Sequence, residues 1–276
     1  MRTEQSAKSM NDGQVGEPPA SAARNAIADR EILGGFLKGL SVIEAFHRDR
    51  EAMTIADAAK ATGLDRATAR RCLLTLTRLG YAEADGRQFR LTARILRLGF
   101  AYLSTAPLPR LVQPFLERLS EATGESCSAS VLDGDEILYV ARASQRRVLS
   151  ISLGVGSRLP AYCSSMGRAL LSALPPAEAR ALLVSSHRRK LTPATVTELG
   201  ELIAILDRVR AADHALVDQE LEVGLRSIAV PLRDGGGKTI GAANVGLHAA
   251  RMSCEAMERT ILPLLREVQA EVARAS

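Results

Sequence analysis

Aromatic side chains are scarce in this sequence. It has no Trp, and Phe and Tyr together make up 3% of the 276 residues. A protein that binds single-stranded nucleic acid by stacking needs several exposed rings, so this class is disfavoured. The cysteines lie far apart, without a C-x-x-C pair or a ligand cluster, which disfavours a zinc site and a disulfide scaffold. We therefore expect no metal and no cofactor; the cysteines are Cys72, Cys127, Cys163 and Cys254.

Long apolar runs are also missing. No stretch approaches the roughly 18 apolar residues that a membrane-spanning helix needs, and residues 1–30 lack the apolar segment of a signal peptide. Together with the scattered cysteines, this favours a cytoplasmic protein with no membrane partner. The length favours two domains. A hydrophobic content of 46% with 24% charged residues is sufficient for a core in each.

The net charge of +5 is concentrated in one short segment. Residues 31–103 hold twelve basic and eight acidic side chains, whereas the 173 residues that follow hold twenty and nineteen. Nearly all of the excess positive charge therefore lies in the first third of the chain. Such a local excess favours a polyanionic partner for that segment.

The same segment has the pattern of a winged helix-turn-helix, which we place at residues 33–92. Apolar residues at helical spacing predict a first helix that ends near His47. Thr54 is the expected cap of a short second helix over 55–62, and Asp65 that of a third helix from Arg66 to Leu79. Asp85-Gly86 then marks a hairpin. Residues 1–32 mix Ser, Ala, Asn, Gly and Pro without a period, which predicts a flexible tail.

The third helix has an apolar stripe and a basic face. We expect Ala69, Leu73, Leu76 and Leu79 to pack against the first two helices, including Phe36 and Leu40. In this motif the N-terminal half of the second helix of the pair enters the major groove, where arginine can bond both acceptors of guanine. The alternative is a solvated charged face. We expect base contacts from the first residues and phosphate contacts from the last three of the set Arg66, Thr68, Arg70, Arg71, Arg78, Arg87 and Arg90.

A connecting helix over 93–103, inside a linker of residues 93–109, separates this unit from a larger one at 110–276. The larger unit mixes helices with strands that we place at 127–133, 136–143, 147–153, 215–220, 226–234 and 239–248. We expect Ser253 to cap a last helix that is bent at Pro263. Mixed elements around one sheet indicate an α+β domain.

Three features of the larger unit suggest a site for a small anion. Ser164 and Ser165 precede a helix whose free N–H groups can receive a carboxylate, although serine at this position is more often only a cap. Arg142 interrupts an apolar strand and matches a carboxylate in two-point geometry, unless it faces outward. Asp218 lies before a Gly224 turn, where an aspartate is more often a turn residue than a ligand.

The sequence resembles the isocitrate-lyase-regulator (IclR-type) family of bacterial transcription factors over residues 33–273. The resemblance is carried by TGLDRATARRCLLTLTRLGYAE in the basic segment, and by RLPAYCSSMGRALLSAL and DQELEVGLRSIAVPLRD in the larger unit. With FLKGLSVIEAF, the latter two are similar to the branch that regulates protocatechuate, 4-hydroxybenzoate and β-ketoadipate catabolism. The family has a winged N-terminal domain, a connecting helix and a GAF-like α+β effector-binding domain.

The resemblance also implies functional residues. Thr68, Arg70 and Arg71 take the DNA-contact positions of the family. Its effector cavity is lined by the stretch around Met166, by the Asp218 position and by the turn from Gly224 to Ser227, and it implies a small acidic metabolite that is aromatic or derived from aromatic ring cleavage. The implied and candidate effector contacts together are Arg142, Ser164, Ser165, Met166, Asp218, Leu225, Ser227, Asn244 and Val245.

Two enzyme-like motifs are weak. DGGGKTIG resembles the end of a phosphate-binding loop, but Leu232 stands where the first glycine is required and a strand follows, so we expect a hairpin turn. Cys163, Ser164 and Ser165 are potential nucleophiles of a hydrolase, but G-x-S-x-G is absent and no histidine has a local signature of a base. A third alternative is a ligand-sensing module that acts through a protein partner.

The favoured interpretation is a regulator that is not an enzyme. It binds double-stranded DNA at a near-palindromic operator as a homodimer or a dimer of dimers, with dimer contacts in the helix over 93–103. A small acidic effector changes the relative placement of the two DNA-binding domains of the dimer, because it binds one arrangement of them more tightly than the other.

Overall fold

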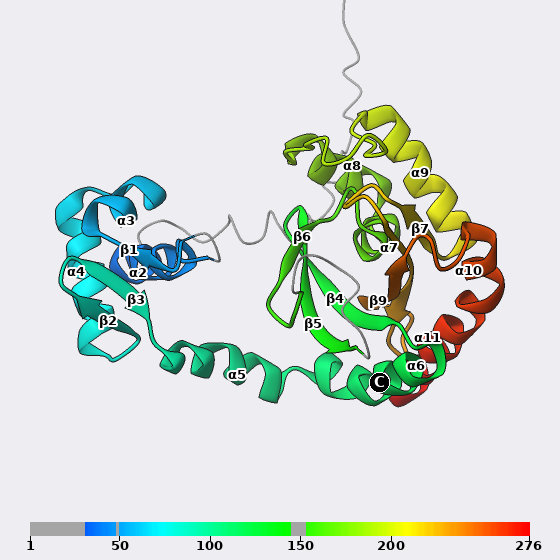
Figure 1. Ribbon diagram of the computed structural model, residues 1–276, viewed down its shortest axis with the longest axis horizontal. Coiled ribbons are helices and arrows are strands. Elements are labelled where there is room, and N and C mark those ends of the chain that lie inside the picture. The colour runs from blue at the N-terminus through cyan, green and yellow to red at the C-terminus, as the bar shows by residue number, and fades with distance from the viewer. Residues whose placement is uncertain (1–30, 48–49, 145–152) are drawn as a thin grey trace, which may run out of the picture. The chain divides into compact units, whose positions relative to one another are not determined.

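The computed structural model describes residues 31–47, 50–144 and 153–276, and the chain divides between Arg94 and Ile95 into two compact units (Figure 1). Residues 1–30 of the tail expected at 1–32 and most of the strand expected at 147–153 lie outside the described residues. Each unit has its own apolar core. An N-terminal helix-turn-helix unit followed by an α+β unit is the predicted fold class.

The N-terminal unit is a winged helix-turn-helix. Its three antiparallel strands are ordered β1-β3-β2, and β2 and β3 pair from Ala82↔Leu91 to Asp85↔Gln88, so that the turn falls at Gly86-Arg87. The hairpin predicted from Asp85-Gly86 is confirmed. The elements in chain order are α2 Gly34–Glu44, β1 Ala52–Met53, α3 Ile55–Thr62, α4 Arg66–Arg78, β2 Ala82–Asp85 and β3 Gln88–Leu91.

Short-range side-chain caps fix the turn between α3 and α4. Thr54 Oγ1 accepts a hydrogen bond from Asp57 N at 3.2 Å, and Asp57 Oδ2 accepts one from Thr54 N at 2.9 Å, which closes a capping box. Gly63 ends α3 at a φ of 70°, where a side chain would be strained. Asp65 then accepts from Thr68 N at 2.9 Å and begins α4. Both predicted caps, Thr54 and Asp65, are confirmed.

The core of this unit differs from the prediction in detail. Ala69, Leu73 and Leu76 of α4 are buried as expected, but Leu79 is 51% exposed because α4 ends at Arg78 and the chain turns away through Gly80. Helix α2 ends at Glu44 rather than near His47. It presents Val42 to the core, while its predicted core residues Phe36 and Leu40 are exposed. The buried cluster is Val42, Met53, Ala58, Ala69, Leu73, Leu76, Ala82 and Phe89.

The C-terminal unit is built on one six-stranded antiparallel sheet in the order β6-β5-β4-β9-β8-β7. The connecting helix is α5, which begins at Leu96 after a 3-10 turn at Ala93–Ile95. It ends at Thr105, two residues beyond the expected end at residue 103. The strands are β4 Ser126–Asp133, β5 Glu136–Ala143, β6 Arg158–Pro160, β7 Ala215–Asp218, β8 Leu225–Arg233 and β9 Thr239–His248. The helices are α5 Leu96–Thr105, α6 Pro107–Thr123, α7 Ser165–Ala173, α8 Pro176–Ser185, α9 Leu199–Ala212, α10 Cys254–Thr260 and α11 Leu262–Ala275.

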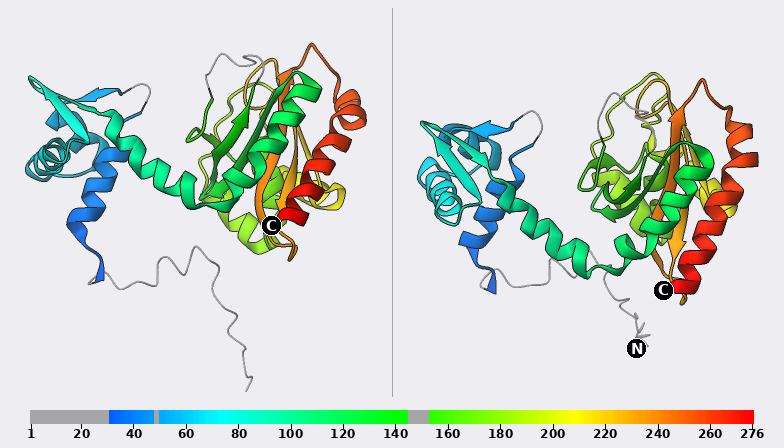
Figure 2. Two further views of the ribbon diagram at one scale, coloured as in Figure 1. Left: turned by 90° about the horizontal axis from the view of Figure 1, so that it is seen from below. Right: turned by 60° about the horizontal axis from the view of Figure 1, so that its bottom comes forward.

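Helices cover both faces of this sheet. The green helix α6 and the red helix α11 lie side by side on one face (Figure 2), and α7, in contact with α9, packs on the other. Because neighbouring residues of a strand point to opposite faces, Val230 and Val245 face α6 and α11, whereas Ala229 and Ala242 face α7. The last helix is interrupted at Ile261, two residues before Pro263.

One glycine holds α7 against the loop that precedes it. A Cβ at Gly167 would lie 2.3 Å from the Ala161 carbonyl oxygen and 2.4 Å from Ala161 Cα, so no larger residue fits without moving the backbone. Glycine here permits the close approach that brings the first turn of α7 over the sheet.

Candidate functional site

The arginines of α4 and of the hairpin form a basic surface on the N-terminal unit. Arg66, Arg70 and Arg71 are exposed in the N-terminal half of α4, and Thr68 beside them is half-buried. Arg78 is exposed at the end of α4; on the hairpin, Arg87 and Arg90 are exposed as well. Within the described parts of the chain, none of these arginines has a salt bridge. Their charge is therefore available to a polyanion.

A second site lies in the C-terminal unit, between the sheet and α7. The cavity has about 560 Å³ of atom-free space, its opening to solvent included. Two cross-strand rows form its floor: Arg142, Ser128 and Asn244 from β5, β4 and β9, and Ser126, Gly246, Ser227 and Val217 from β4, β9, β8 and β7. The rest of the lining is Ile137, Tyr139, Leu153, Leu159, Cys163, Ser164, Ser165, Met166, Leu221 and Leu225.

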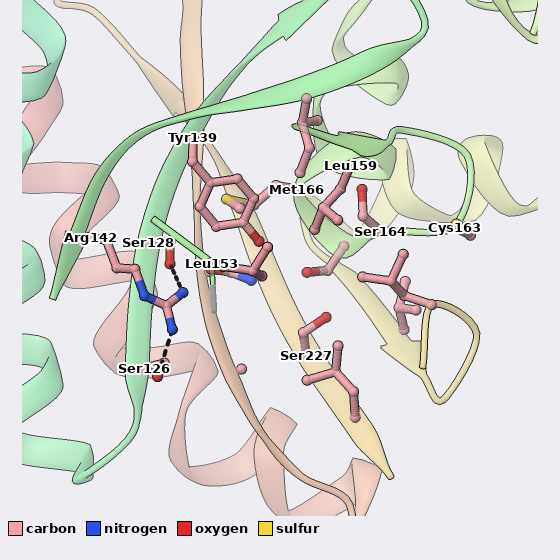
Figure 3. A pocket seen from close by; sticks show the side chains of 17 residues that line it. Ser126, Ser128, Tyr139, Arg142, Leu153, Leu159, Cys163, Ser164, Met166 and Ser227 are labelled. Atoms are coloured by element: carbon pink, nitrogen blue, oxygen red, sulfur yellow. Dashed lines mark hydrogen bonds between the residues drawn. The ribbon is translucent and has the colours of Figure 1, made fainter. Parts of the chain in front are cut away.

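Arg142 is held in this cavity by neutral partners. Its two terminal nitrogens donate to Ser128 Oγ and Ser126 Oγ, each at 3.2 Å (Figure 3). No carboxylate pairs with it among the residues that the structure describes. The two serines orient the guanidinium without neutralising it, so the cavity keeps one positive charge that is suited to an anion.

The first turn of α7 forms the opposite side of the cavity (Figure 3). Ser164 Oγ accepts from Gly167 N at 3.3 Å, so this serine is the helix cap and lines the cavity as well. Ser165 Oγ is buried and has no partner in the described chain. Met166 is anchored by Ser130, whose hydroxyl lies 3.3 Å from its sulfur. The helix N-terminus therefore adds a second region of positive potential.

Two predicted effector contacts are not at the cavity. Asp218 binds Arg226 with two hydrogen bonds of 2.8 and 2.9 Å, and these lower the pKa of its carboxyl. Val245 is fully buried on the opposite face of the sheet because it neighbours Asn244 in the strand. Neither residue lines the cavity, so the structure does not bring these two together with the other predicted contacts. The other seven do line it: Arg142, Ser164, Ser165, Met166, Leu225, Ser227 and Asn244.

The sequence interpretation also missed part of the lining. Ser126 and Ser128 alternate with buried Cys127 and Ala129 on β4. Alternating serines in an otherwise apolar strand indicate that one face of the sheet lines a polar space. That signal was available in the sequence, whereas the contact of Tyr139 with the cavity was not.

Comparisons with known proteins identify the family. The model described as "Bacterial transcriptional regulator IclR C-terminal" matches residues 100–274, and the "IclR helix-turn-helix domain" matches residues 37–86. The chain belongs to the IclR family. It therefore belongs with DNA-binding transcriptional regulators rather than with enzymes.

Three relatives place this IclR-family chain more narrowly. It is 42% identical to the Pca regulon regulatory protein of Pseudomonas putida over 248 residues, which are 90% of this chain and 85% of that one. It is 37% identical to the p-hydroxybenzoate hydroxylase transcriptional activator of Acinetobacter baylyi, and the match covers 89% of this chain and 93% of that one. An IclR homolog from Microbacterium hydrocarbonoxydans, solved as a complex with 4-hydroxybenzoate, is 28% identical with a TM-score of 0.72 and coverage of 88% and 100%. The chain is thus similar to regulators of the protocatechuate and 4-hydroxybenzoate branch.

The thiol and the phenol that line the cavity of this IclR-family chain, Cys163 and Tyr139, are neutral. Burial raises the pKa of the Cys163 thiol to about 11 and that of the Tyr139 hydroxyl to about 12. A neutral thiol is a poor nucleophile, and none of the four histidines is part of the cavity lining. Cys163 therefore has neither the ionisation nor the base that the hydrolase alternative needs.

The expected hairpin turn at DGGGKTIG is confirmed. It joins β8 to β9, and Asp234 Oδ1 accepts from Gly236 N and Lys238 N at 3.0 and 2.9 Å. In the portion of the chain that the structure describes, no helix is both long and apolar enough to cross a bilayer.

A buried ion pair that sequence reasoning missed holds α7 in place. Arg168 and Glu220 form two parallel hydrogen bonds of 2.6 and 2.7 Å, and their side chains are 3% and 10% exposed. Arg168 Nε also donates to the Tyr162 carbonyl at 2.8 Å, and Glu220 accepts from Val196 N at 3.0 Å. The pair links α7 to the segment after β7, so it fixes the side of the cavity that carries Ser164 and Ser165.

Proposed function

We propose that this chain regulates genes of aromatic-acid catabolism by binding an operator through α4 and a small carboxylate in the cavity of the C-terminal unit. The observation that carries the proposal is the Arg142 guanidinium, which lines the cavity and is held by two serine hydroxyls instead of a carboxylate. A carboxylate effector supplies the missing negative charge and receives a two-point, charge-assisted hydrogen bond.

The lining of the cavity suits an acid with a ring or a carbon chain. Its apolar lining includes Ile137, Leu159 and Leu221, which can pack against a ring or a carbon chain. The polar groups lie at two ends, with Arg142 at one and the N-terminus of α7 at the other. The proteins named for the pca regulon and for p-hydroxybenzoate hydroxylase, and the relative solved with 4-hydroxybenzoate, support an aromatic acid or a product of ring cleavage.

Replacement of Arg142 by Met tests the effector site. We expect the wild-type chain to bind at least one of 4-hydroxybenzoate, protocatechuate and β-ketoadipate in titration calorimetry, and Arg142→Met to bind it at least about 30-fold more weakly, because the carboxylate then lies in the cavity without its cation. Arg118→Met, which removes an exposed arginine of α6, is the control and should leave the affinity unchanged. Equal affinities of the two variants would show that Arg142 does not bind the effector. If none of the three acids binds the wild type, the assignment to the protocatechuate and 4-hydroxybenzoate branch is wrong.

On the DNA side, the two ends of α4 have different roles. Arg66, Thr68, Arg70 and Arg71 occupy the N-terminal half of the helix that enters the major groove in this motif, and there arginine reads guanine. Phosphate contacts fall to the arginine at the end of α4 and to the two of the hairpin, since these groups flank a helix in the groove. The phosphate-contacting set is Arg78, Arg87 and Arg90.

A symmetric assembly completes the function. A homodimer, alone or paired into a dimer of dimers, binds the two halves of a near-palindromic operator. Helix α5 supports self-association, because Leu96 and Phe100 are 70% and 69% exposed in the chain by itself. Effector binding changes operator affinity to the extent that the acid prefers one of the two states of the assembly, and the coupling is reciprocal.

A further inference from the structure

One acceptor in the effector cavity has no donor. Asn244 Oδ1 is buried and makes no hydrogen bond within the described chain, and the whole residue is only 8% exposed. Buried polar atoms without a partner are uncommon, because each costs the desolvation of the group with nothing in return. Such an atom in the wall of a binding cavity points to a ligand group that completes it.

The neighbours of Asn244 explain why the protein itself leaves it unpaired. In the sheet it lies between Ser128 of β4 and Ala229 of β8, and the next residue of β9 on the same face is Gly246. Ala229 and Gly246 have no side-chain donor. Ser128 Oγ accepts from Arg142 on its other side and forms no hydrogen bond with Asn244 Oδ1 in the described chain, so Asn244 and Arg142 flank one serine in a single row across three strands.

We infer that Asn244 selects effectors that carry a hydroxyl in addition to their carboxylate. With the carboxylate at Arg142, an effector hydroxyl that reaches Asn244 donates to Oδ1 and satisfies it. An acid without that hydroxyl leaves the oxygen buried and unpaired, and binds more weakly. Ser165, the other unpartnered group of the cavity, can either donate or accept and so discriminates less. This inference rests on the proposed function, because it requires an acid in the cavity.

The test is a specificity ratio measured by titration calorimetry on the full-length protein. Benzoate is compared with 3-hydroxybenzoate, 4-hydroxybenzoate and 3,4-dihydroxybenzoate. The wild type should bind at least one hydroxylated acid about 10- to 100-fold more tightly than benzoate. In Asn244→Leu, which keeps a branched side chain and removes the acceptor, this ratio should fall to nearly one while benzoate binds at least as well as before. Asn244→Ala, which opens space instead of filling it, should lose the ratio as well.

Two controls separate specificity from structure. Ser172→Ala removes a buried hydroxyl that bonds within α7, to the Ala169 carbonyl, and should leave the ratio unchanged. Thermal unfolding without ligand should show the midpoint of Asn244→Leu unchanged or raised, since no bond is lost, whereas a structural asparagine would lower it.

Three results would overturn the inference and leave the proposed function standing. The first is an unchanged ratio in both Asn244 variants, and the second is a wild type that binds benzoate as tightly as its hydroxylated relatives. The third is exclusive binding of β-ketoadipate, which has no hydroxyl, with an affinity that depends on Arg142. Failure of every acid to bind the wild type would instead overturn the proposed function, and this inference with it.

Discussion

Arg168→Met is expected to destabilise the C-terminal unit by about 3–5 kcal/mol, the range for breaking one side of a buried ion pair. The substitution leaves Glu220 buried with one backbone donor, Val196 N, in place of the two-point contact. It also frees the Tyr162 carbonyl. Most small domains are stable by only 5–15 kcal/mol, so this is the largest effect on stability that we predict. Urea unfolding followed by far-ultraviolet circular dichroism measures it.

Arg158, which forms two exposed ion pairs in the same unit, is the matched control. Arg158 on β6 contacts Asp133 and Glu136 at 2.6 Å each, but its side chain is 42% exposed. Arg158→Met should therefore cost no more than about 1 kcal/mol, because water screens the pair and solvates the partners that remain. If Arg168→Met and Arg158→Met cost the same, burial does not set the strength of the Arg168–Glu220 contact, and our account of how α7 is held is wrong.

The double substitution of Arg70 and Arg71 by Ala should reduce operator affinity by roughly 30-fold to 30,000-fold, because each arginine–guanine contact contributes about 1–3 kcal/mol. Both side chains are exposed and make no salt bridge in the described chain, so the fold should be retained. The affinity is measured by fluorescence anisotropy at one fixed salt concentration. The operator is a fragment that the wild type selects from random DNA, and a shuffled fragment reports binding without specificity.

Arg78→Ala is the comparison at the other end of α4. A lost phosphate contact weakens binding to both fragments alike and lowers the slope of log affinity against log salt by about 0.9. The double variant should instead lose its preference for the selected fragment. If it keeps that preference, the N-terminal half of α4 does not read the bases, and the basic face is only a solvated surface.

Local signals in the sequence were sufficient for the caps and tight turns of the N-terminal unit. Caps and tight turns are decided by residues three or four positions apart, so Thr54, Asp65 and the Asp85-Gly86 turn could be predicted without knowledge of the fold. Burial was harder to predict. Leu79 continues the apolar stripe of α4 in sequence but follows the last helical residue, and only the direction of the chain after it places it in solvent.

The lining of the cavity in the C-terminal unit depends on strand register, which residues far apart in sequence decide. Asn244 and Val245 are adjacent in sequence, yet one faces the cavity and the other the opposite core, and the pattern alone did not separate them. The carboxylate of Asp218 is a group that could contact an effector, but it is paired with Arg226 of the neighbouring strand. The Arg168–Glu220 pair joins residues 52 positions apart, which no sequence period reveals.

The central claim is that an acid in the cavity changes the affinity of the chain for DNA. Gly246 offers a direct way to test it, because a Cβ there meets only Leu225 Cδ1 at 3.9 Å, so that Gly246→Val fills the floor of the cavity without a backbone clash. The decisive measurement is operator affinity by anisotropy, with and without a saturating acid that binds the wild type. We predict a change of about 5- to 150-fold for the wild type, and none for Gly246→Val, whose affinity without acid should equal that of the wild type. A wild type whose operator affinity is the same with and without the bound acid would contradict the account.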